Sequence, residues 1–205
     1  MSKVIALVGS PRADGNTVFM ANVALKELAA QGIETELITL IGKQIHPCTG
    51  CYGCIEAKRC VIDDDFQEIF QKMLAADGIL LCSPVYHASI TPELKAVMDR
   101  AGFSGRWAAN DMKSKSESYS WGGTVFSGKV ASPLAVARRA GQDFAIAQML
   151  MWMMVNDFIV VGSTYWNLFM AGKGGAKDAA EDSEGIGTIE HMAQNMAHVI
   201  KQLNK

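Results

Sequence analysis

Short apolar runs alternate along the chain with longer segments in which apolar residues recur at helical spacing. Residues 3–8 are apolar after the first position and rich in β-branched side chains, which is typical of a buried strand. Residues 17–30 instead place apolar side chains three to four positions apart, as an amphipathic helix does. The same patterns predict strands at 3–8, 33–40, 78–82, 129–137 and 158–161, and helices at 17–30, 66–76, 92–101, 143–155 and 188–203.

Strands that alternate with helices in this way indicate an α/β fold with a parallel sheet. Crossover connections place the helices on both faces of such a sheet, and ligands bind at the carboxyl ends of its strands. Two connections, 103–127 and 163–187, are longer than usual and are therefore expected to be functional or disordered loops. We predict a single domain over residues 1–205, with a long insertion at about 103–127, because no linker divides the chain.

Charge and hydropathy exclude several classes of function. The net charge of −2 offers no broad basic surface, so we expect neither nucleic acid nor acidic lipid as a partner. The apolar run at residues 4–8 is too short for a signal peptide or a membrane span. We therefore expect a cytoplasmic protein that does not enter membranes.

The loop after the first strand carries the pattern of a phosphate site. Gly9 to Thr17 opens directly into the first helix, where backbone N–H groups and the helix dipole favour an anion. Ser10, Asn16 and Thr17 add side-chain donors, and Arg12 adds a positive charge. The loop has neither the Gly-Lys-Ser/Thr ending of a nucleoside-triphosphate loop nor the spacing of a dinucleotide fold. The alternative is an ordinary turn in which Asn16 or Thr17 only caps the helix.

A second loop follows the third strand at the same edge of the predicted sheet. Residues 82–89 read Cys-Ser-Pro-Val-Tyr-His-Ala-Ser and offer backbone amides beside an aromatic ring. A flat heteroaromatic ligand such as an isoalloxazine could stack there. Taken singly, Tyr86 is better explained as a surface aromatic residue and His87 as a loop histidine.

These motifs together resemble a known family. The chain is similar to the NADPH-dependent FMN reductase group of flavodoxin-like proteins, and within it to the iron-sulfur flavoproteins and their cluster-free relatives. The resemblance implies a five-stranded sheet in the order 2-1-3-4-5. It rests on Gly9-Ser10-Pro11-Arg12 with Asn16-Thr17, the cysteine segment at 48–60, Ser83-Pro84-Val85-Tyr86, Leu94-Lys95-Ala96 with Asp99-Arg100, Arg138-Arg139-Ala140-Gly141, and residues 162–167.

The resemblance also implies where FMN binds. Its phosphate would be held by Ser10, Arg12, Asn16 and Thr17, and a third loop around Arg138 and Gly141 would approach the flavin. The isoalloxazine would be lined by Pro84, Val85, Tyr86, His87, Ala88 and Ser89. A neighbouring subunit often completes such sites, so we expect a homodimer or homotetramer. Residues 103–127, with Trp107 and Trp121, are our candidate for a subunit contact or lid, and a surface insertion is the alternative.

Four of the five cysteines are concentrated in one segment. Cys48, Cys51, Cys54 and Cys60 follow the spacing C-x2-C-x2-C-x5-C, which resembles the ligand runs of iron-sulfur proteins. Zinc sites more often use two separated pairs. A 4Fe-4S cluster, bare thiols and zinc all remain open, whereas Cys82, within an apolar run, is expected to be a core residue.

The hypothesis from sequence is an FMN-dependent oxidoreductase. NAD(P)H or a ferredoxin-like redox protein would supply electrons, and the flavin would pass them to an acceptor. No proton-transfer residue is identified, although Tyr86 and His87 are the nearest candidates. The rival hypothesis is a non-enzymatic flavin and iron-sulfur electron carrier, or a redox sensor based on the cysteine loop.

Overall fold

A parallel sheet forms the centre of the molecule. The computed structural model describes residues 1–110, 122–172 and 177–204. The strands in this part of the chain are β1 (Lys3–Val8), β2 (Glu34–Thr39), β3 (Gly78–Pro84), β4 (Val130–Ala137), β5 (Ile159–Val160) and β6 (Leu168–Met170). The strand order β2-β1-β3-β4-β5 confirms the predicted flavodoxin-like topology, and β6 pairs with β4.

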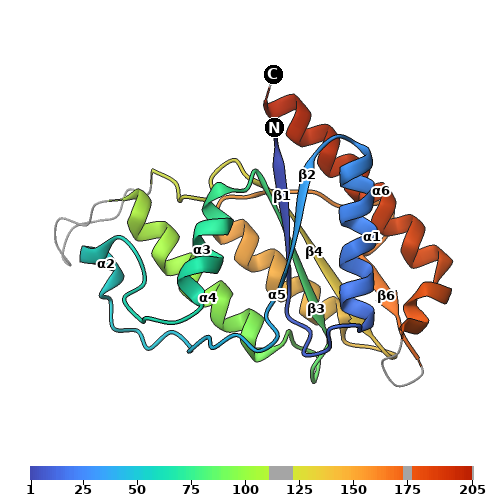
Figure 1. The fold of residues 1–205 in the computed structure, drawn as a ribbon, viewed down its shortest axis with the longest axis horizontal. Helices are drawn as coiled ribbons and strands as arrows, with labels where there is room; N and C mark the ends of the chain where they lie inside the picture. The colour runs from blue at the N-terminus through green and yellow to red at the C-terminus, as the bar shows by residue number, and fades with distance from the viewer. Residues whose placement is uncertain (111–121, 173–176, 205) are drawn as a thin grey trace.

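Helices cover both faces of the sheet (Figure 1). One face carries α1 (Asn16–Ala30) and α6 (Ser183–Leu203), and the other carries α3 (Phe66–Ala75), α4 (Pro92–Ala109) and α5 (Gln142–Val155). Two short helices, α2 (Cys54–Ala57) and the 3₁₀ helix η1 (Lys177–Glu181), lie in connections. No helix in the described ranges is long and apolar enough to span a membrane.

Alternation along β1 divides the core into two layers. Val4, Ala6 and Val8 pack beneath α1 and α6, whereas Ile5 and Leu7 pack beneath α3 and α4. All five side chains are fully buried because successive residues of a strand point to opposite faces and both faces are covered. This explains why the strand is continuously apolar in the sequence.

The edge of the sheet beside β4 differs from the prediction. One strand was expected at 158–161 and a long loop at 163–187, but two short strands pair with different halves of β4. The chain leaves the sheet between them, and Ser132 in β4 spans the break. Its hydroxyl donates to the carbonyl of Val161 and accepts a hydrogen bond from the amide of Asn167. The loop prediction was therefore wrong for β6, η1 and the start of α6.

The predicted insertion also begins later than expected. The helix predicted to end at residue 101 continues to Ala109, and Gly105 lies so close to the ring of Phe126 that a Cβ there would be 2.8 Å from it. Gly102 and Gly105 lie inside this helix, where the absence of a side chain allows Trp152, Val125 and Phe126 to pack closely. Trp107 is 5% exposed and therefore cannot be the expected surface contact, and Trp121 lies outside the described residues.

Candidate functional site

A cleft opens where β1, β3 and β4 end. The register pairs Val8 with Cys82, and Cys82 with Leu134, so the loops that follow these three strands emerge side by side. The cleft has a volume of about 280 Å³, close to the lower end of the range for small-molecule sites, roughly 300–1,000 Å³. It is lined by Ser10, Pro11, Arg12, Gly15, Asn16, Thr17, Pro84, Val85, Tyr86, Val136, Ala137, Arg138 and Ala171.

The first loop presents the N-terminus of α1 to this cleft. Gly15 is the N-cap residue, and within the described chain no side chain caps the helix and no acidic residue occupies its first turn. The N–H groups there and the positive end of the helix dipole can therefore act on an anion. The hydroxyl of Ser10 accepts a hydrogen bond from the backbone N–H of Arg12 at 3.2 Å, which shapes the loop.

Asn16 has a role that the sequence did not reveal. Its side-chain amide donates to Asp178 at 2.7 Å and accepts from the backbone N–H of Ala179 at 3.0 Å. These bonds attach η1 to the start of α1. Ala171, just after β6, lines the cleft for the same reason: the C-terminal segment returns to this edge.

The second loop forms a tight turn at the rim of the cleft. Tyr86 and Ser89 exchange two backbone hydrogen bonds, at 2.8 and 2.9 Å, around His87 and Ala88, which both have positive φ. This left-handed backbone is strained for residues other than glycine, and such strain concentrates at functional sites. Tyr86 remains 44% exposed beside the cleft.

Four predicted positions do not line the cleft. They are His87, Ala88, Ser89 and Gly141. The hydroxyl of Ser89 donates to Gln148 of α5. Gly141 adopts φ +92° and approaches the second loop so closely that a Cβ would lie 3.1 Å from both Ala88 Cα and Val85 Cγ1. Gly141 thus packs directly against the second loop, and a side chain at this position would be both crowded and strained by the positive φ.

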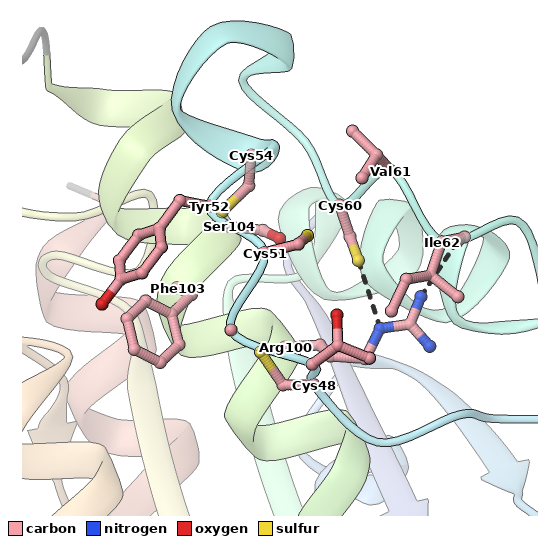
Figure 2. Close-up of a pocket in the computed structure, with 12 residues that line it drawn as sticks. Cys48, Cys51, Tyr52, Cys54, Cys60, Val61, Ile62, Arg100, Phe103 and Ser104 are labelled. Atoms are coloured by element: carbon pink, nitrogen blue, oxygen red, sulfur yellow. Dashed lines mark hydrogen bonds between the residues drawn. The ribbon is translucent and has the colours of Figure 1, made fainter.

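The four clustered cysteines line a separate pocket of about 50 Å³ (Figure 2). Its other walls include Val61, Ile62 and Phe103. In the described part of the chain, no three His, Cys, Asp or Glu side chains are close enough to share one metal ion. A single zinc ion needs its thiolates about 2.3 Å from one point. The four thiols surround a pocket instead of converging on one point.

The environments of these thiols differ. Hydrogen bonds from the backbone N–H of Gly53 and from the hydroxyl of Thr49 lower the pKa of Cys51, which is exposed. Burial raises the pKa of Cys54, and the neighbouring cysteines contribute to that increase. Cys82, by contrast, is fully buried in β3, as predicted for a core residue.

Arg100 is a buried charge beside this pocket that sequence reasoning did not place in a site. It forms an ion pair with Asp64 at 2.6 Å, and the two side chains are 0% and 3% exposed. Burial opposes ionisation of Asp64, but Arg100 and the N–H groups of His46 and Phe66 outweigh it and lower the pKa. The spacing along the helix could have indicated that Arg100 is buried. It lies three residues after Val97 and four before Ser104, and both of these residues are on the buried face of α4.

Comparison with known proteins agrees with this geometry. The family model described as NADPH-dependent FMN reductase matches residues 2–172. The chain belongs to this family. It is 36% identical over 213 aligned positions to an iron-sulfur flavoprotein of Methanocaldococcus jannaschii, covering 99% of this chain and all of that protein. It is 30% identical over 211 positions to an iron-sulfur flavoprotein of Methanosarcina thermophila, covering 99% and 97% of the two chains.

A solved structure supports the fold. The crystal structure of RosB with bound 8-demethyl-8-formylriboflavin-5′-phosphate superposes with a TM-score of 0.76 at 19% identity, covering 100% of this chain and 81% of RosB. At that identity the likeness concerns the fold alone. As a member of the NADPH-dependent FMN reductase family, the protein belongs to the FMN-binding, flavin-dependent oxidoreductases.

Proposed function

We propose that this protein binds FMN in the cleft at the ends of β1, β3 and β4 and transfers electrons from NAD(P)H to an acceptor. The observation that carries the proposal is the convergence of an uncapped helix N-terminus, Arg12 and Tyr86 on one cleft. Bound FMN would supply hydride and single-electron chemistry that no side chain can supply. The protein contributes binding, orientation and electrostatics.

The first loop would hold the phosphate of FMN. Backbone N–H groups at the start of α1 would donate to the phosphate oxygens, and Arg12 would offset their charge. Ser10 and Thr17 are 4% and 2% exposed, so their hydroxyl groups have few water molecules to replace. Asn16 would act mainly by keeping η1 attached to the loop.

The second and third loops would position the flavin ring. Pro84, Val85 and Tyr86 lie on one side of the cleft, and Val136 and Arg138 lie on the β4 side. The apolar side chains would exclude water from the ring, while Arg138 would place a positive charge close to it. Gly141 packs directly against the second loop.

We further propose that Cys48, Cys51, Cys54 and Cys60 hold a 4Fe-4S cluster. The fit rests on the donor set, since four thiols line one pocket whose walls are apolar and which contains one buried cation, Arg100. Thiolate ligands carry negative charge, and Arg100 donates a hydrogen bond to one of these sulfurs, that of Cys60. A cluster there would allow the protein to handle single electrons.

The exposed face of α5 supports association of the chain with copies of itself. Phe144, Met151, Met154 and Val155 are each at least 59% exposed on this helix, an unusual concentration of apolar surface. Ala88 of the second loop lines the same groove as Phe144 and Met151, so the surface borders the proposed flavin site.

We expect light scattering after size-exclusion chromatography to give the mass of a dimer or tetramer. Met151→Glu should lower the measured mass, because it places a charge on this apolar surface. A monomeric wild-type protein would contradict this expectation.

The proposed function is tested by anaerobic purification followed by titration with reductants. We expect a yellow protein that carries FMN and loses its flavin absorbance on addition of NADPH or NADH. A colourless protein that also fails to bind added FMN would contradict the proposal. Reduction by reduced ferredoxin, with no response to either nicotinamide, would replace the enzyme by an electron carrier.

A further inference from the structure

Arg100 forms more contacts with the cysteine segment than a structural ion pair requires. Its side chain lies in the middle of α4 and is 1% exposed. Nη1 donates to Asp64 Oδ2 at 2.6 Å and to the carbonyl of His46 at 3.1 Å, and Nη2 donates to the carbonyl of Ile62 at 3.0 Å. The guanidinium carbon is 4.2 Å from the centre of the Phe66 ring. Every part of the buried cation thus has a partner, as burial demands.

The remaining contact reaches a thiol. Nε of Arg100 donates to Sγ of Cys60 at 3.3 Å, and the sulfur points toward the arginine side chain (Figure 2). Cys60 is itself buried, at 8% exposed, whereas Cys48 and Cys51 are exposed. Cys60 is thus a buried member of the cluster that a side chain from a distant helix holds by a hydrogen bond.

The backbone contacts show how the segment is fastened. His46 lies two residues before Cys48, and Ile62 lies two residues after Cys60, so Arg100 binds the chain on both sides of the cysteine run. Between Cys54 and Cys60 the chain forms only the four-residue helix α2 and then turns at Lys58, which has φ +54°. This part has little secondary structure of its own to hold Cys60.

We propose that Arg100 is a positioning residue that closes the cysteine segment and presents Cys60 as the fourth ligand of the cysteine site. The proposal rests on the cluster put forward above. Hydrogen bonds to ligand sulfurs are among the factors that set cluster potentials, and the bond from Arg100 Nε to Cys60 Sγ favours the reduced state. Arg100 therefore determines both whether the cluster assembles and how readily it accepts an electron.

Lysine cannot replace arginine in this arrangement. An ammonium group keeps the charge but lacks the planar fork that reaches two carbonyls, a carboxylate and a sulfur at once. Arg100→Lys thus keeps the positive charge but loses the hydrogen bonds that position the cysteine segment. Arg100→Gln loses both the charge and these hydrogen bonds. Arg106→Lys is the matched control because Arg106 lies on the same helix and does not line the cysteine pocket.

The experiment has one measurement on apoprotein and two on reconstituted protein. Hydrogen exchange of apoprotein, followed by mass spectrometry, should be at least tenfold faster in peptides covering residues 58–64 of Arg100→Lys, with no change in residues 16–30. Anaerobic reconstitution should give about four irons per wild-type chain and less than half as many in both Arg100 variants. Any cluster retained should have a more negative midpoint potential. Arg106→Lys should match the wild type in all three.

The outcomes separate the two proposals. Wild-type iron content, potential and exchange in Arg100→Lys would overturn the role of Arg100. A wild-type protein that takes up no iron would contradict the cluster proposal. Hydrogen exchange of the apoprotein would then still decide whether Arg100 holds Cys60 in place.

FMN content reports whether each variant folds. If Arg100→Gln fails to bind FMN, the variant Asp64→Asn is used in place of Arg100→Gln. That variant keeps Arg100 but weakens its anchor, so it should lose part of the iron; unchanged iron would also count against the proposal.

Discussion

Replacing Arg12 by alanine is expected to weaken FMN binding by roughly 10- to 100-fold, whereas riboflavin binding should change by less than about threefold. A hydrogen bond to a charged group contributes about 1.5–3 kcal/mol, and each 1.4 kcal/mol corresponds to about a tenfold change in affinity. Only FMN carries the phosphate that the first loop would bind. Fluorescence titration of apoprotein with both flavins measures the difference.

Arg139→Ala is the matched control for this experiment. Arg139 is exposed and adjacent to Arg138, but it does not line the cleft. Its removal changes the net charge by the same amount and should leave the affinity for both flavins nearly unchanged. If Arg12→Ala weakened FMN and riboflavin equally, the phosphate would have to bind elsewhere, and the proposed orientation of FMN would be wrong.

Replacing Cys51 by alanine should abolish assembly of the cluster, reducing iron from about four per chain to less than one after anaerobic reconstitution. A cubane cluster with one thiolate missing exposes an iron atom to solvent and to loss. Val61→Ala is the control, since it shortens another side chain that lines the pocket. FMN content should be unchanged in both variants because the cleft and the cysteine pocket share no residue among those described.

This result is checked by colorimetric assays of iron and acid-labile sulfide. The absorbance of the visible sulfur-to-iron charge-transfer bands is measured alongside them. Full iron content in Cys51→Ala would show that these cysteines are not the ligand set. Zinc in place of iron in aerobically and anaerobically prepared wild-type protein would revive the alternative left open by the sequence.

Helix α4 connects the two proposed sites. At its start, Thr91 and Leu94 lie so close to Gly9 that a Cβ on Gly9 would overlap both, which seats the first loop against the helix. Two turns later the same helix carries Arg100 beside the cysteines (Figure 2). One rigid element therefore positions parts of both sites, although the sequence offers no local sign of this connection.

The sequence by itself determined the fold class and the main cleft. Apolar spacing distinguishes strand from helix locally, and parallel strands place all their carboxyl ends at one edge, so Ser10 and Pro84 could be brought together without coordinates. The spacing of the four cysteines likewise carries its meaning within 13 consecutive residues, 48 to 60. Each of these inferences needs only short-range pattern and general rules of topology.

Only the tertiary structure decided the contacts that join distant segments. Arg100 and Cys60 are 40 residues apart, and Asn16 and Asp178 are 162 apart. No local pattern encodes such pairs, because each depends on how whole layers pack against one another. The same reason explains β6 and the long α4: Ser132 and Phe126 stabilise them from elsewhere in the chain, overriding glycines and polar residues that locally indicate loops.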